Sequence, residues 1–233
     1  MKKTIVSITF FALSSLIIWS FSSDHSLVTD DNSSQGRSIA SSKEARTSYK
    51  KRIRAINHLA ICFESRSCGF SKNDSRSYDL ELGNAIKREL DSLYEEILDN
   101  EVQASWVSSL ARRYMKISNG HVKESALMLM STQGPSSENL SSILNDAISF
   151  HSAPLAELAL VELSKYQTST WREEIDKSFI TNLSRGSLFV RQTLAKNIES
   201  FLNSENRELY KEFVESLPGS SKVKRYIMAS LNN

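Results

Sequence analysis

The residues of this chain that could do sulfur chemistry lie in one short stretch, together with a histidine. Cys62 and Cys68 are the only cysteines, and His58 precedes Cys62 by one helical turn. Four interpretations are open: a disulfide, as is usual for a cysteine pair in an exported protein, a three-ligand metal site, a Cys62 thiolate activated by His58, or two plain free thiols. Structural zinc needs four ligands and no fourth is visible. We therefore expect a disulfide, with no metal and no cofactor.

The rest of the sequence offers no common catalytic pattern. It contains no Gly-rich phosphate loop, no G-x-S-x-G elbow and no H-E-x-x-H helix. Ser221 and Lys224 fit S-x-x-K, but a serine before an apolar periodic segment is better interpreted as a helix cap. These observations favour a binding protein over an enzyme. A thiol- or metal-dependent enzyme that uses Cys62 and His58 is the alternative.

The N-terminal segment has the pattern of an export signal. Lys2 and Lys3 precede an apolar stretch, and Ser20 and Ser22 provide small residues for cleavage. We predict a signal peptide over residues 1–22 of a type common in bacteria, and hence a periplasmic or secreted protein. If the segment is retained, it is about long enough to span a membrane, which takes roughly 20 residues. The chain would then be an anchored structural subunit.

The part of the chain that follows the predicted signal is formally neutral and begins with a polar segment. Removal of Lys2 and Lys3 leaves 29 − 2 = 27 basic residues against 27 acidic ones. A neutral chain lacks the cationic surface that nucleic-acid binding requires, so we expect no nucleic-acid partner. Residues 23–41 are small and polar, which predicts a disordered tether. The remainder is long enough for one domain with a core.

Apolar residues recur at a constant step in the C-terminal part. Val122, Leu155, Val190 and Val223 follow one another at steps of 33, 35 and 33 residues, and apolar residues stand four and eight positions after each. We call these twelve positions the second-helix frame: Val122, Ala126, Met130, Leu155, Ala159, Leu163, Val190, Leu194, Ile198, Val223, Ile227 and Leu231. Spacing of four marks one face of a helix, so the sequence predicts four equivalent helices.

A second set of apolar triplets precedes these helices with the same period. This first-helix frame consists of Trp106, Leu110, Tyr114, Leu140, Leu144, Ile148, Ile175, Phe179, Leu183, Leu209, Phe213 and Leu217. Its starting residues follow at steps of 34, 35 and 34. Two helical frames with one period predict an all-α array of four helix pairs over residues 100–233, in which each pair covers the apolar face of the next.

The phrases HVKESALMLM, LFVRQTLAKNI and SKVKRYIMASL resemble the second helix of HEAT repeats, which often begins with a Val-Arg or Val-Lys pair. The resemblance covers residues 101–233. It implies a right-handed α-α superhelix of stacked antiparallel helix pairs, a HEAT-like α-solenoid with degenerate repeats. Such arrays bind proteins or peptides on their curved surface.

Residues 42–99 predict an N-terminal helical pair that carries the Cys62–Cys68 loop between its helices. The first helix, residues 42–63, is basic on its polar face, whereas the second, residues 78–99, is acidic. We interpret the two as solvated helices that face each other with opposite charge.

These observations lead to one functional expectation. We predict an exported, non-catalytic helical-repeat protein that binds another protein or a peptide. By analogy with such arrays, polar residues at the start of the second helices are expected to line the binding surface. They are Lys123, Glu124, Glu157, Arg191, Gln192, Lys224 and Arg225.

Overall fold

The structure is a computed structural model that describes residues 35–70 and 74–233. The predicted signal peptide and residues 23–34 of the predicted tether lie outside the described residues. Residues 35–41 form the start of the first helix, so this helix begins seven residues earlier than the sequence predicted. The chain divides into two units, residues 1–43 and 44–233, and the description below concerns the second unit.

The described residues form helices joined by turns, with no strand among them. The N-terminal pair consists of α1 (Gln35–Ser65) and α2 (Ser75–Asp99). Four further pairs follow: α3 (Ser105–Met115) with α4 (Gly120–Ser131), α5 (Ser137–Ser142) and its π-helical continuation η1 (Ile143–Ile148) with α6 (Ala153–Leu163), α7 (Ser169–Arg185) with α8 (Leu188–Asn197), and α9 (Arg207–Glu215) with α10 (Lys222–Asn232). Short 3₁₀ turns, η2 (Ser164–Tyr166) and η3 (Ile198–Phe201), follow α6 and α8.

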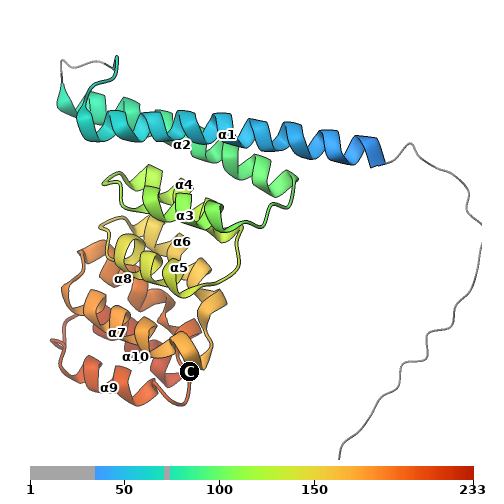
Figure 1. Cartoon of the computed structure of the whole chain (residues 1–233). Coiled ribbons are helices and arrows are strands. Elements are labelled where there is room, and N and C mark those ends of the chain that lie inside the picture. Colours follow the sequence, from blue (N-terminus) through green and yellow to red (C-terminus); the bar gives the residue numbers. More distant parts are fainter. Residues whose placement is uncertain (1–34, 71–73) are drawn as a thin grey trace, which may run out of the picture. The chain divides into compact units, whose positions relative to one another are not determined.

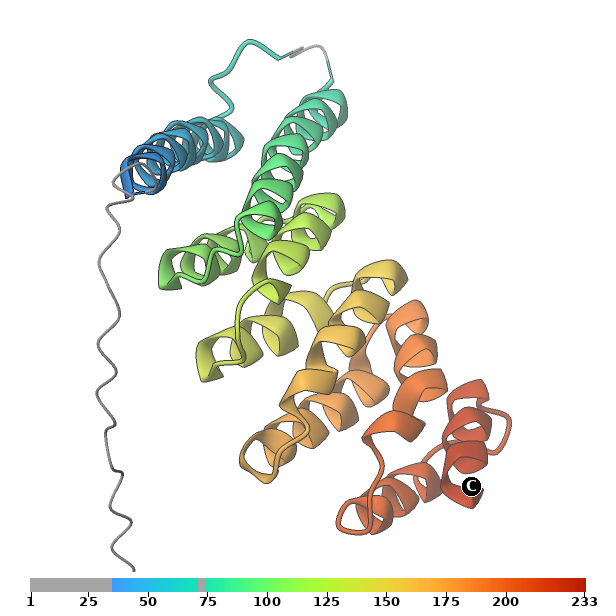
Figure 2. The same cartoon turned by 90° about the vertical axis from the view of Figure 1, so that its right-hand side faces the viewer.

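The pairs pack in chain order, as Figures 1 and 2 show from two sides. Within each of the four later pairs the two helices contact each other across a loop of two to six residues, as is typical of antiparallel helical hairpins. The second helices form a continuous layer in which α2 packs on α4, α4 on α6, α6 on α8 and α8 on α10. The first helices lie beside this layer, where α3 contacts α5 and η1 contacts α7.

The second-helix frame accounts for the core of this layer. All twelve of its residues are buried, from Val122 in α4 to Leu231 in α10. A helix that is buried on one stripe needs an apolar residue every three or four positions, and four such stripes in contact make one continuous core. The predicted all-α class is therefore confirmed for the described residues.

The first-helix frame is confirmed in three pairs and wrong in the fourth. The triplets of α3, of α5 with η1, and of α7 are buried, apart from partly buried Trp106. In α9, by contrast, Leu209 is 43% exposed, whereas Tyr210 and Val214 are fully buried. This helix is therefore turned by one residue relative to the predicted register.

The N-terminal pair is held by the opposite charges that its sequence predicts. Arg52 of α1 pairs with Glu96 at 3.1 Å and with Glu89 at 3.3 Å, both on α2. Nearer the connecting loop, the Tyr78 hydroxyl donates to the Cys62 carbonyl at 3.1 Å. The order of these contacts shows that α1 and α2 run antiparallel. Arg52 is only part-exposed, so its pairs stabilise the register more than a fully exposed ion pair would.

Within the described ranges, no helix combines the length and the apolar character needed to cross a membrane.

Candidate functional site

The second helices begin alike because each has a side-chain cap. Asn119, Ser152 and Ser187 accept hydrogen bonds from the backbone N–H groups of the three frame residues that begin α4, α6 and α8, at 3.2 to 3.4 Å. Ser221 caps α10 by accepting from the Lys224 N–H at 3.4 Å, as the sequence predicted. Such caps satisfy an N–H that the helix leaves without a partner. They therefore set each second helix at an equivalent point of its hairpin.

The basic residue that follows the frame residue closes the hairpin. In three of the four pairs it reaches back to a carbonyl at the end of the preceding helix, where a cation is favoured by the unpaired carbonyls and the helix dipole. The contacts are Lys123 Nζ to the Met115 carbonyl, Arg191 Nε to the Leu183 carbonyl at 2.7 Å, and Lys224 Nζ to the Leu217 carbonyl at 3.2 Å. The second pair has Ala156 at this position and lacks the contact.

These contacts change the role of three residues that the sequence placed on a binding surface. Lys123 is only 5% exposed, and its ammonium also lies 5.1 Å from the centre of the Phe150 ring. Burial lowers the pKa of Lys123, and the nearby Asp146 carboxylate opposes this shift. Arg191 and Lys224 are half-buried. The basic residue of the Val-Arg or Val-Lys pair therefore closes its hairpin, and Lys123 is buried in doing so.

We expect Lys123→Ala to lower the free energy of unfolding by about 2 kcal/mol, because it removes a charge-assisted hydrogen bond and leaves a helix-terminal carbonyl without a donor. Urea unfolding of the variant and of Glu157→Ala measures this difference. Glu157 is exposed, so its replacement is expected to change stability by less than about 0.5 kcal/mol. Equal stability of the two variants would contradict the closing role of Lys123.

The other predicted binding residues do face outward. Glu157 and Arg225 are exposed, and Glu124 and Gln192 are half-buried. All four stand two positions after the frame residue, on one side of the second-helix layer. Glu124 is paired with His121 at 3.3 Å, one turn earlier in α4. The structure thus brings these four residues together on consecutive helices and separates them from the three hairpin-closing cations.

Apolar residues that the sequence interpretation missed lie between these polar residues. Three of them share the outward side of consecutive second helices: Met128 in α4, Val161 in α6 and Phe189 in α8, which are 37%, 71% and 65% exposed. Met128 and Val161 stand six positions after the frame residue and Phe189 one position before it, and in a helix these positions point the same way. The outward position could therefore have been found by extending the frame.

We call the outward positions of α4, α6, α8 and α10 the second-helix face. It comprises His121, Glu124, Met128, Pro154, Glu157, Val161, Phe189, Gln192, Lys196, Lys222, Arg225 and Ala229. The two acidic residues lie on α4 and α6, whereas its lysines and arginine lie on α8 and α10. The exposed apolar residues are contributed mainly by the middle helices. Apolar residues gathered on one face and bordered by charge are typical of a protein-binding surface.

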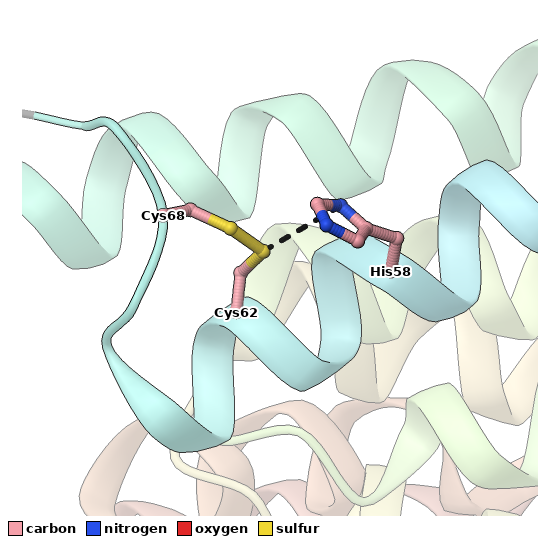
Figure 3. Close-up of side chains that lie close together, drawn as sticks. All are labelled: His58, Cys62 and Cys68. Carbon is pink, nitrogen blue, oxygen red and sulfur yellow. Dashed lines mark hydrogen bonds between the residues drawn. A yellow bond between two sulfur atoms is a disulfide. The ribbon is translucent and has the colours of Figure 1, made fainter.

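The cysteine cluster lies at the end of α1. Cys62 and Cys68 form a disulfide with a Cα–Cα distance of 5.3 Å, and the His58 Nδ1 atom lies 3.7 Å from the Cys62 sulfur (Figure 3). Cys62 is buried, and the phenol of Tyr78 donates to its carbonyl and accepts from the Cys68 N–H. The predicted pairing is confirmed. By chain entropy, a loop of this size contributes about 2 kcal/mol to stability.

The disulfide affects whether the cysteine cluster could bind a metal ion or act as a nucleophile. The ligand atoms of His58, Cys62 and Cys68 lie within 4.8 Å of one another, so the three could surround one metal ion. Both metal binding and nucleophilic attack require thiolates, however, and a sulfur in a disulfide is not a thiolate. Either activity would first require reduction of the bond. In the oxidised state the cluster fastens the loop between α1 and α2.

Comparisons with protein-family models, with curated proteins and with solved structures found no significant match to this chain.

Proposed function

We propose that this chain is an exported helical-repeat protein that binds another protein or a peptide through its second-helix face. The four hairpins would form a right-handed superhelix of the HEAT type with the second helices on the inner side. The packing supports this arrangement, because the second helices contact one another in succession, whereas a groove opens beside the Asp176–Tyr210 contact of the first helices α7 and α9. A stack that is tighter on one side curves toward that side.

The observation that carries the proposal is the exposure of Met128, Val161 and Phe189 on consecutive helices. An isolated exposed apolar residue needs no explanation, but a row across three elements does. Buried aromatic and aliphatic anchors at the centre of an interface usually provide most of the binding energy. We expect Val161 and Phe189 to be such anchors, because they are the most exposed of the three.

The charges around this row indicate the chemistry of the partner. Glu124 and Glu157 border it toward α4, and Lys196, Lys222 and Arg225 border it toward α10. A complementary segment has apolar residues at its centre, basic residues at the end over α4 and acidic residues at the other. Such complementarity orients a partner and excludes the reversed direction.

Export is supported by two observations of different kinds. The pattern of residues 1–22 is that of a signal peptide. The Cys62–Cys68 disulfide fits an oxidising compartment such as the periplasm or the cell exterior.

A pull-down with the tagged, disulfide-bonded protein from cell-envelope extract tests the binding proposal. We expect Val161→Asp combined with Phe189→Asp to reduce recovery of the partner at least tenfold, on the order expected for loss of two anchor residues. The matched control is Leu80→Asp with Leu98→Asp, which changes two exposed leucines of α2 that lie outside the face. The proposal fails if both variants retain the same partners.

A further inference from the structure

The first-helix layer contains a groove that is independent of the second-helix face. It lies between α7 and α9, has a volume of about 590 Å³, and is lined by Ser169, Arg172, Glu173, Asp176, Lys177, Ile180, Thr181, Glu205, Asn206 and Leu209. Eight of these ten residues are polar or charged, and Ile180 and Leu209 provide the two aliphatic walls. Its volume is within the range of sites that take a small ligand or a few side chains, roughly 300–1,000 Å³.

A buried carboxylate forms part of this groove. Asp176 is only 7% exposed, and it accepts hydrogen bonds from the Tyr210 hydroxyl at 2.8 Å and from the Asn206 amide at 3.1 and 3.2 Å. Both donors are neutral. Among the residues that the structure describes, no lysine or arginine nitrogen lies within 4 Å of this carboxylate. A buried negative charge without a cation is unfavourable, so the site would gain from one.

The cations that line the groove are placed so that they do not neutralise Asp176. Arg172 is engaged elsewhere, since it donates to the Gln167 carbonyl at 3.0 Å and pairs with Glu205 at 3.5 Å. Lys177 is exposed at the rim. With Glu173 included, the lining carries three carboxylates against two cations, which leaves one excess negative charge.

The groove exists because α9 is turned from the register of the other first helices. The turn brings Tyr210 inward, where its hydroxyl reaches Asp176, and leaves Leu209 outward as a wall. Asn206, just before α9, links Asp176 to the Phe201 carbonyl, to which it donates at 2.9 Å. The Asp176 carboxylate is therefore held in place by Tyr210 of α9 and by Asn206, which is itself held by the Phe201 carbonyl of η3.

We propose that this groove receives a lysine or arginine side chain of a partner protein, with its aliphatic stem against Ile180 and Leu209 and its cationic head directed at Asp176. Lysine and arginine combine an aliphatic stem with a terminal cation. That combination matches apolar walls beside a buried carboxylate. A purely apolar side chain would leave Asp176 without a cation, and an acidic one would be repelled.

The direct test uses Nα-acetyl-lysine N-methylamide as a probe and the norleucine analogue, which has a similar stem without the ammonium, as its control. Both are titrated into the full disulfide-bonded protein, and backbone amide shifts are followed by NMR. We expect saturable shifts in α7 and α9 with the lysine probe at roughly tenfold higher affinity, a factor on the order of one hydrogen bond to a charged group. Equal affinity of the two probes, or no saturable shift, would overturn the proposal.

Two variants locate the site. Asp176→Asn is expected to remove the preference for lysine over norleucine, whereas Glu174→Gln, which removes an exposed charge of the same helix outside the groove, is expected to keep it. Leu209→Lys places an ammonium of the chain itself in the groove, and we expect it to block binding of the lysine probe. Because Leu209 is exposed, this variant is expected to fold, so it tests the site independently of Asp176→Asn. Undiminished probe binding to Leu209→Lys would refute the assignment. These outcomes do not depend on the second-helix face.

Discussion

Leu140→Ala is expected to lower the free energy of unfolding by about 3 to 5 kcal/mol, whereas Leu209→Ala is expected to change it by less than about 0.5 kcal/mol. The two leucines open the first-helix triplets of the second and fourth pairs, so the sequence assigns them the same role. In the structure Leu140 is fully buried in α5, but Leu209 is 43% exposed on α9. Truncation of Leu140 leaves a cavity among α3, α5 and their neighbours, and truncation of Leu209 removes only surface contacts.

Urea unfolding of both variants, with the slope against denaturant checked for constancy, measures this contrast. Tyr210→Ala provides a complementary measurement, because the turned register predicts that Tyr210, not Leu209, carries the core contact of α9. We expect a cost similar to that of other buried aromatic truncations, about 3 to 5 kcal/mol. Similar destabilisation by Leu140→Ala and Leu209→Ala would show that the fourth pair keeps the register of the sequence frame.

The register of α9 illustrates where the sequence stops being informative. Residues 209, 213 and 217 and residues 210 and 214 are both apolar or aromatic at helical spacing, so periodicity alone does not choose between them. The choice is made by a polar partner on another helix, since Tyr210 can satisfy its hydroxyl on Asp176. A tertiary hydrogen bond of this kind has no signature in local spacing. In the second-helix frame the constant step between the pairs selected the stripe, and its twelve positions were predictable.

The candidate binding surface was predictable to a similar extent. The sequence places the second helices side by side, and their outward positions then follow from helical geometry. Helical geometry does not show which basic side chains remain exposed on that surface, because a long side chain can turn back onto its own hairpin. Lys123, Arg191 and Lys224 do so, and their target carbonyls lie seven or eight residues earlier in the chain. The helix termini that attract these cations become visible only when the turn geometry is known.

The second pair lacks the contact between a basic residue and a carbonyl of the preceding helix, and it still packs in the array. Ala156 cannot donate to the preceding helix, and that helix ends in the π-helical stretch η1. The pair keeps its Ser152 cap and its buried frame residues. Hairpin closure by a basic residue is therefore an addition to the packing of the frame, consistent with our expectation that Lys123→Ala costs less than Leu140→Ala.

The stability of the protein is expected to fall by about 3 kcal/mol between roughly pH 9 and pH 11, because buried tyrosines resist ionisation. Burial raises the pKa of Tyr114 to about 12, an effect that Arg113 opposes and Glu64 reinforces. Burial also raises the pKa of Tyr210, and the adjacent Asp176 carboxylate adds to the shift. In the unfolded chain both phenols ionise near their ordinary pKa of 10.0.

The direction follows from the protons that each state binds. Above pH 10 the folded protein keeps both phenolic protons while the unfolded chain releases them, so the free energy of unfolding decreases as pH rises. Each tyrosine contributes about 1.4 kcal/mol in total between pH 9 and pH 11, because the full slope of about 1.4 kcal/mol per pH unit is reached only well above pH 10. Lys123 acts in the opposite direction, because its lowered pKa makes the unfolded chain bind more protons below its ordinary pKa of 10.5.

Variants separate these contributions. Urea unfolding across this range is expected to show a loss of stability between pH 9 and pH 11 that is smaller by about 1.4 kcal/mol in Tyr210→Phe, since phenylalanine has no proton to lose. Tyr114→Phe should flatten the slope similarly up to about pH 12, where its own folded-state ionisation begins. Lys123→Met should make the loss begin at lower pH. If the slope of Tyr210→Phe equals that of the unaltered protein, Tyr210 ionises as readily in the fold as in the unfolded chain. That result would contradict the buried hydrogen bond between Tyr210 of α9 and Asp176 of α7.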